Sequence, residues 1–125
     1  MAEPLTEGAR SNHRGLMIVL SYLWPLALVP FLLEKHDREV QWHARHGIVL
    51  MLAELVLWAG LAFMTNIAAL AALGLVVLLG LLTIAAYVIV LTLHIVAIAK
   101  GLTGGRLIVP GLSEFADSIF PTPPR

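Results

Sequence analysis

The chain contains no cysteine and few charged residues. Without cysteine it can form no disulfide bond, thiol nucleophile or cysteine-ligated metal site. Only 13% of its 125 residues are charged and 59% are hydrophobic, whereas soluble domains average about 25% and about 45–50%. Lys and Arg balance Asp and Glu at eight each, so no net positive field is present to attract nucleic acid. With a mean hydropathy of +0.90, this composition is typical of a membrane protein.

Recognisable catalytic and nucleotide-binding motifs are also missing. The chain has no G-x-G-x-x-G fingerprint and no P-loop, so nothing in it favours nucleotide binding. None of its serines stands in the context of a catalytic triad. We therefore predict that the protein is not an enzyme and holds no cofactor.

Long apolar runs make up most of the chain. They predict an all-α, polytopic helical membrane protein with three, possibly four, transmembrane segments and a C-terminal amphipathic helix. The predicted domains are a flexible tail at 1–15, a helical membrane domain at 16–120 with spans at about 16–33, 47–64 and 74–99 and an amphipathic helix at 111–120, and a second tail at 121–125.

The first predicted span, residues 16–33, is the least regular of the three. Pro25 and Pro30 each remove a backbone donor and should kink the helix or shorten its regular part. A shallow re-entrant segment that enters the membrane and returns is the alternative.

The last apolar run, Ile67 to Ala99, is longer than one membrane crossing requires. As a single helix its 33 residues would measure about 50 Å, against a hydrocarbon core of about 30 Å. Thr65 and Asn66 form the polar break before it. We therefore predict an interfacial turn or short helix over 67–73, followed by the spanning helix at about 74–99.

The polar stretch, defined as Glu34 to Gly47, carries three of the five histidines of the chain. With three spans it shares one membrane side with the C-terminal segment, and six Lys or Arg residues lie there, against two on the other side. The positive-inside rule then places the polar stretch and the C-terminus in the cytoplasm. The side chains predicted to bind partners are Lys35, Arg38, Trp42, His43, Arg45 and His46.

Three residues of the polar stretch have the spacing of metal ligands. Glu39, His43 and His46 stand at i, i+4 and i+7, on one face of a helix, and could form part of a shell for zinc, iron or manganese. A solvated helix face anchored by Trp42 is the simpler interpretation, and we predict no bound metal. A third interpretation has the histidines gaining charge below about pH 6.5 and strengthening contact with anionic lipid.

Glu54 and His94 are the ionisable residues inside the predicted spans. In an antiparallel helix pair both would lie about 8–10 Å below the same membrane surface, and could share a hydrogen bond or a proton. A polar clamp between helices is the favoured role of this intramembrane pair. A proton or ion pathway is the alternative.

Two stretches resemble one family of small bacterial membrane proteins. SYLWPLALVPFLLEKHDREVQWHARHGIVL (Ser21 to Leu50) resembles its proline-bearing helix, charged loop and H-A-K/R-Q-G motif, and AIAKGLTGGRLIVP (Ala97 to Pro110) resembles its A-x-K-G…P ending. The family is a domain of unknown function related to the twenty-kilodalton component of the chloroplast inner-envelope translocon. It includes the magnetosome proteins MamF and MmsF. The resemblance covers nearly all of residues 16–120.

The chain departs from the family pattern at two places. His46 replaces the glutamine of the H-A-K/R-Q-G motif, and the aromatic and basic residues before the final proline are reduced to Arg106. The resemblance implies a helical protein of the bacterial inner membrane, or of an organelle membrane derived from it. It also implies other membrane proteins, or further copies of the chain, as partners besides the lipid bilayer. We predict an accessory, assembly or scaffold role through residues 34–46, with an ion, proton or solute pathway and metal handling as alternatives.

Overall fold

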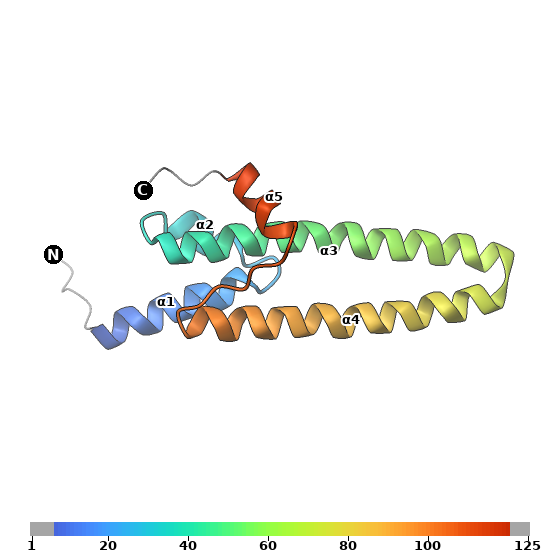
Figure 1. Cartoon of the computed structure of the whole chain (residues 1–125), viewed down its shortest axis with the longest axis horizontal. Coiled ribbons are helices and arrows are strands. Elements are labelled where there is room, and N and C mark those ends of the chain that lie inside the picture. The colour runs from blue at the N-terminus through green and yellow to red at the C-terminus, as the bar shows by residue number, and fades with distance from the viewer. Residues whose placement is uncertain (1–6, 121–125) are drawn as a thin grey trace. The chain divides into compact units, whose positions relative to one another are not determined.

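The computed structural model of the chain describes residues 7–120. In this range the chain forms five helices and no strand, which confirms the predicted all-α class (Figure 1). The helices are α1 (Glu7–Ser21), α2 (Leu28–Leu33), α3 (Arg38–Ala71), α4 (Leu73–Leu102) and α5 (Leu112–Ile119).

The chain divides into two compact parts, and the division passes through α3 and α4. The terminal part comprises Met1–Met51 and Val96–Arg125, and the hairpin part comprises Leu52–Ile95. Of the terminal part, residues 7–51 and 96–120 are described.

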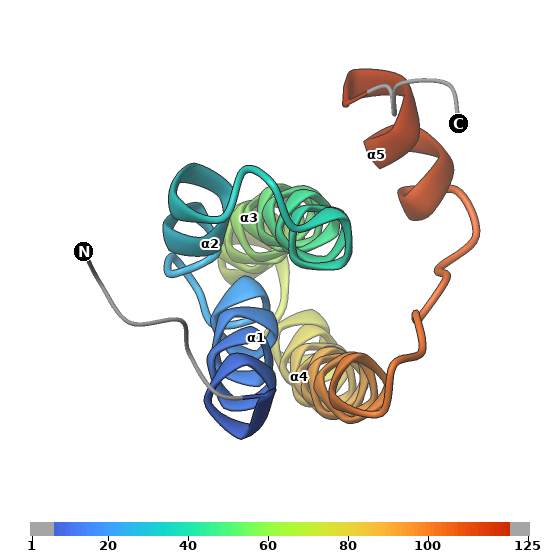
Figure 2. The ribbon, with the colours of Figure 1, turned by 90° about the vertical axis from the view of Figure 1, so that its left-hand side faces the viewer.

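The terminal part has a small apolar core. Met17, Ile18 and Tyr22 come from α1 and the turn after it. They pack against Val40 of α3 and Ala97 of α4. Figure 2 shows α1 and α2 beside the first turns of α3. This core fixes the start of α3, which carries most of the polar stretch.

Residues 16–33 do not form the single helix predicted for them. α1 ends at Ser21, and Pro25 has no N–H to donate to the Ser21 carbonyl, so the helix cannot continue past it. Pro30 lies in the first turn of α2, where a missing N–H breaks no helical hydrogen bond. The prolines therefore divide the segment into two helices, instead of bending one. Among the helices that the structure describes, only α3 and α4 are long and apolar enough to cross a membrane.

The structure describes only part of the two predicted tails. Residues 1–6 and 121–125 lie outside the described residues. Residues 7–15, predicted as part of a flexible tail, instead belong to α1.

A close backbone contact joins the end of α1 to α3. An added Cβ on Gly47 would lie 1.6 Å from the carbonyl oxygen of Ser21 and 2.8 Å from its carbonyl carbon. Both atoms are backbone, so no side chain can turn away to make room. Gly47 is thus required for this approach, and with it for the packing of Ile18 and Tyr22.

The hairpin part is an antiparallel pair of helices with little interior. The helices reverse direction at Ala72, the single non-helical residue between α3 and α4. The most apolar 18-residue stretch of α4 has no buried residue, and only 22% of the corresponding stretch of α3 is buried. Helices from the core of a soluble protein would be mostly buried, whereas residues 7–120 leave these apolar faces uncovered.

α3 extends past the polar break that was predicted to end it. Thr65 Oγ1 donates a hydrogen bond to the Leu61 carbonyl, and Asn66 Nδ2 donates one to the Ala62 carbonyl, both at 2.8 Å. Because these side chains bond to their own helix, they do not interrupt it. The turn or short helix predicted at 67–73 is therefore wrong for most of its length.

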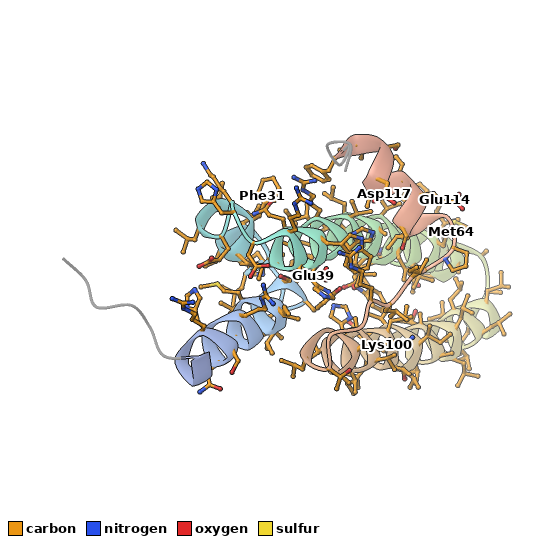
Figure 3. The ribbon with its side chains drawn as sticks, turned by 60° about the vertical axis from the view of Figure 1, so that its left-hand side comes forward. Phe31, Glu39, Met64, Lys100, Glu114 and Asp117 are labelled. Atoms are coloured by element: carbon orange, nitrogen blue, oxygen red, sulfur yellow. The ribbon has the colours of Figure 1, made fainter. Side chains whose placement is uncertain are left out.

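The C-terminal helix forms where it was predicted. Gly111 precedes α5 with φ of 82°, a left-handed conformation that glycine adopts without strain. Ser113 and Ala116 face inward. Phe115 and Ile119, on its apolar face, are about half exposed. Figure 3 includes the side chains of this helix, with Glu114 and Asp117 labelled.

Candidate functional site

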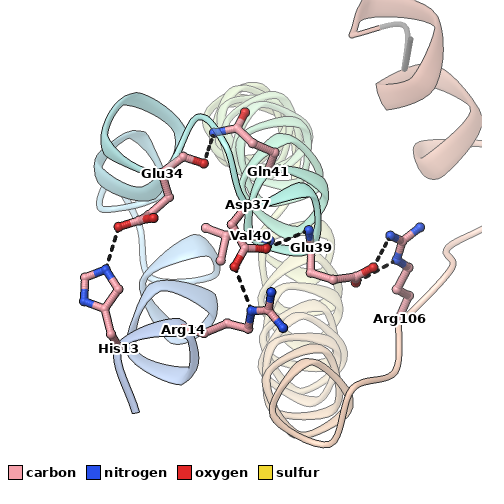
Figure 4. Close-up of polar contacts among 8 residues, drawn as sticks. All are labelled: His13, Arg14, Glu34, Asp37, Glu39, Val40, Gln41 and Arg106. Atoms are coloured by element: carbon pink, nitrogen blue, oxygen red, sulfur yellow. Dashed lines mark hydrogen bonds and ion pairs between the residues drawn. The ribbon is translucent and has the colours of Figure 1, made fainter. Parts of the chain in front are cut away.

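Within the polar stretch, Asp37 caps the N-terminus of α3. Asp37 Oδ1 accepts hydrogen bonds from the backbone N–H groups of Glu39 at 3.0 Å and Val40 at 3.3 Å (Figure 4). Arg14 of α1 donates to Asp37 Oδ2 at 2.7 Å. Burial of Asp37 raises its pKa, but the hydrogen bonds from Arg14 and the two N–H groups outweigh burial and lower the pKa below its ordinary value. Asp37 therefore joins α1 to α3 as a carboxylate.

Gln41 ties the end of α2 to α3. Its side-chain amide nitrogen lies 2.9 Å from the carbonyl oxygen of Phe31, 3.0 Å from that of Glu34 and 3.4 Å from that of Pro30. The Pro30 carbonyl also accepts the Glu34 N–H, but the carbonyls of Phe31 and Glu34 lie at and after the end of α2, where no further turn of helix supplies N–H donors. The role of Gln41 is thus structural.

His43 lies in the interior of the terminal part. It is 1% exposed, and its Nδ1 shares a hydrogen bond of 2.7 Å with the Tyr22 hydroxyl. A Cβ on Gly101 would come within 3.2 Å of the His43 ring. His43 therefore links α1, α3 and the end of α4, and in this conformation it has no surface to offer a partner.

Arg106, Trp42 and His46 form a stack. The Arg106 guanidinium carbon lies 4.7 Å from the centroid of the Trp42 ring, and the Trp42 and His46 rings stack at 3.8 Å with 22° between their planes. Arg106 also donates two hydrogen bonds to the carboxylate of Glu39, at 2.6 and 3.1 Å (Figure 4). The segment that follows α4 is thus bound to the start of α3.

The three candidate metal ligands do not converge on one point. Glu39 pairs with Arg106, His43 bonds to Tyr22, and the Nδ1 of His46 donates to the Trp42 carbonyl at 2.8 Å. In residues 7–120, no group of three or more His, Asp or Glu side chains is arranged to hold a metal ion. The structure thus gives each candidate ligand a separate role.

A cavity of about 710 Å³ opens between the start of α3, the segment at Arg106 and α5. We call it the basic cavity. Its cationic lining residues are Lys35, Arg38, Arg45 and Arg106, and its carboxylates are Glu39 and Asp117. Trp42, His46 and Phe120 supply ring surfaces. All predicted partner-binding residues except His43 therefore line one cavity.

The accessibility of these residues differs. Lys35 and Arg38 are exposed, Trp42 and Arg45 are half-buried, and His46 is buried. His46 was predicted to bind partners, but at 7% exposure it supports the wall of the basic cavity more than it offers an outer surface.

In the hairpin part, Glu54 and His94 come together. Glu54 Oε1 lies 3.3 Å from His94 Nε2, and both side chains are largely buried. His94 Nδ1 lies 2.9 Å from the Val90 carbonyl, which can only accept, so Nδ1 carries a hydrogen. The two side chains therefore form a close polar contact between α3 and α4, in which Glu54 Oε1 has no hydrogen-bond partner among the described residues.

An aromatic pair lies in the same hairpin. The rings of Trp58 and Tyr87 stack at 4.2 Å with 25° between their planes. Trp58 stands one turn after Glu54 on α3, and Tyr87 two turns before His94 on α4. Sequence reasoning missed this pair, although these spacings of four and seven residues were visible.

Several residues of the terminal part were also missed. Tyr22, Asp37, Gln41 and Arg14 all gain their roles from contacts with other helices. The available signal was Asp37 directly before a helical run, which is the pattern of a helix cap.

These features define an all-helical protein with two helices long and apolar enough to cross a membrane. Comparison with protein-family models, with curated proteins and with solved structures found no match. The family resemblance stays a prediction.

Proposed function

We propose that this chain is an integral membrane protein that acts as an accessory, assembly or scaffold component and catalyses no reaction. The uncovered apolar surface of the hairpin part carries this proposal. Along α4, large side chains such as Leu78, Ile84 and Leu91 are each 62% exposed. Burial of one such side chain is worth about 1.5–3 kcal/mol, so a hairpin of this kind favours lipid or neighbouring helices over water.

The proposed topology has two spans, α3 and α4, with residues 16–33 as a re-entrant or interfacial segment. All eight Lys and Arg residues then lie on one side, because none occurs between His46 and Ala99. The three-span arrangement divides them six to two. Two spans thus follow the positive-inside rule more closely, and they place both ends of the chain in the cytoplasm of a bacterial inner membrane or a membrane derived from it.

The absence of cysteine makes this topology easy to test. Single variants Lys35→Cys and Ala72→Cys are treated in intact spheroplasts with a thiol reagent that does not cross membranes. We expect labelling of Ala72→Cys from outside, and labelling of Lys35→Cys only after the membrane is permeabilised. The reverse pattern would overturn the orientation, and outside labelling of both variants would overturn the two spans.

The partner is proposed to be another membrane protein or a second copy of the chain. The exposed edge of the basic cavity, Lys35 and Arg38, is the proposed contact, since His43 and His46 are buried. A photo-crosslinking residue at either position should give discrete adducts in membranes. The same residue at Arg10, which is exposed and does not line the basic cavity, is the matched control. Monomer alone from Lys35 and Arg38, or equal adducts from Arg10, would contradict the proposal.

A proton or ion pathway is the second candidate, favoured by the Glu54–His94 contact of 3.3 Å. A carboxyl group this close to an imidazole could share a proton with it and pass that proton between the helices of an oligomer. In reconstituted vesicles, Glu54→Gln should then abolish flux, while Thr92→Val should not, because the Thr92 hydroxyl bonds only to its own helix. If the wild type shows no flux, or Glu54→Gln leaves it unchanged, the pair is a structural clamp.

A further inference from the structure

We infer that the basic cavity binds a phosphate group together with a neighbouring hydroxyl. This ligand chemistry occurs in a glycerophospholipid headgroup and in a soluble phosphate ester. The inference rests on the proposed membrane function only for the choice between these two sources.

The cationic side chains of the basic cavity exceed its carboxylates. Four cations and two carboxylates line it, and one carboxylate, Glu39, is already held by both hydrogen bonds of Arg106. Asp117 is the other, and it forms no ion pair with the described residues. Two positive charges therefore remain uncompensated in the cavity lining.

Arg45 supplies an unused donor in this lining. Its Nε is buried and has no hydrogen-bond partner among residues 7–120. Arg45 Nη1 donates a hydrogen bond to the Phe120 carbonyl, and this bond is long at 3.4 Å. A guanidinium presents its donors in a fixed fork that matches phosphate oxygens. Small shifts of Arg45, together with the exposed Arg38, would bring such a fork onto an anion.

His46 supplies a second unpartnered polar atom. The side chain is 7% exposed and lines the cavity, yet its Nε2 makes no hydrogen bond within the described chain. Because Nδ1 donates to the Trp42 carbonyl, Nε2 of the neutral ring is an acceptor. A buried acceptor without a partner is costly, and a ligand hydroxyl beside the phosphate would satisfy it.

The remaining lining favours a headgroup as the source. Trp42 and Phe120 provide ring surfaces for carbon atoms beside the phosphate. α3 passes from Arg45 and His46 directly into its apolar stretch, so in a spanning α3 the cavity lies at headgroup level. Phosphatidylglycerol combines the phosphate with free hydroxyls.

The test uses the purified full-length chain. Retention of phosphatidylglycerol against phosphatidylcholine is measured by native mass spectrometry, and binding of radiolabelled glycerol 3-phosphate by equilibrium dialysis. The variants are Arg38→Gln, Arg45→Gln and His46→Asn, and Lys100→Gln is the matched control because it removes one charge outside the basic cavity. The helical content of each variant is checked by circular dichroism.

We expect selective retention of phosphatidylglycerol, weakened at least about tenfold by Arg45→Gln, as for the loss of one hydrogen bond to a charged group. Arg38→Gln, an exposed change that should not affect folding, is expected to weaken it as well. Binding of glycerol 3-phosphate in addition would support the site and add a soluble source. Binding of neither probe, or equal losses in Lys100→Gln, would overturn the inference while leaving the topology test untouched.

Discussion

Replacing Gly47 with alanine tests the contact between α1 and α3, because the new methyl group would meet backbone on the other side. The added Cβ would lie 1.6 Å from the Ser21 carbonyl oxygen. Real Cβ atoms essentially never approach closer than 3.0 Å, so the two backbones would have to separate by more than 1 Å. That separation would loosen Ile18 and Tyr22 in the core of the terminal part.

The expected loss of stability is large for one methyl group. Overpacking a tight core costs about 1–3 kcal/mol, and more where neither side can yield. We expect Gly47→Ala to lie at or above the upper end, despite the gain of up to about 1 kcal/mol that alanine brings to a helix interior. The measurement is thermal unfolding in detergent, followed by circular dichroism.

Two other glycines provide matched controls. Gly60 lies in the same helix with no atom within 4 Å of an added Cβ, so Gly60→Ala should be neutral or stabilising. Gly101→Ala should be intermediate, because its closest contact, at 2.4 Å, is the Cγ2 methyl of Ile18, which belongs to a side chain and not to the backbone. If Gly47→Ala proves as stable as Gly60→Ala, the close approach of α1 to α3 is refuted.

Tyr22→Phe should destabilise the chain by about 1–3 kcal/mol, since it leaves buried His43 without its partner; stability equal to the wild type in thermal unfolding would contradict this. The lowered pKa of Asp37 means that its ionised form contributes stability fully above its ordinary pKa of 3.8, and that this contribution disappears as the pH falls through the lower folded-state value. The difference in melting temperature between the wild type and Asp37→Asn should therefore shrink below pH 3.8, and a constant difference would argue against the pairing. Tyr87→Ala should lose about 0.5–1.5 kcal/mol of stacking on Trp58 beyond lost burial. The readout is the emission of Trp58 in a chain whose other two tryptophans, Trp24 and Trp42, are replaced by Phe, and an unchanged emission would show that the rings do not stack.

Composition and length were sufficient to predict the helical class and two of the three apolar helices. A run as apolar as Ile67–Ala99 has few ways to satisfy its backbone in lipid except as a helix. The predicted pairing depth of Glu54 and His94 depended on helical rise alone, and these two side chains do lie together in the structure.

The points that failed depend on local competition that composition does not reveal. Thr65 and Asn66 read as a polar break, but their side chains can bond to carbonyls one turn back, and in α3 they do so. For residues 16–33, the pattern could not show whether the prolines would bend one helix or divide two. In the structure they divide it, and the Ser21 carbonyl at the end of α1 lies against Gly47.

By itself the sequence determined the helical class and the places of the two longest apolar helices, because hydropathy and helical rise act locally along the chain. Only the tertiary structure decided which contacts the residues of the polar stretch make. The spacing of its residues was compatible with a metal shell, with a solvated helix face and with a partner surface. Contacts from elsewhere in the chain separated these roles: Tyr22 holds His43 in the core, Arg106 holds Glu39, and Arg45 and His46 keep unpartnered polar atoms in a basic cavity. Such contacts join residues far apart in sequence, and no local pattern encodes them.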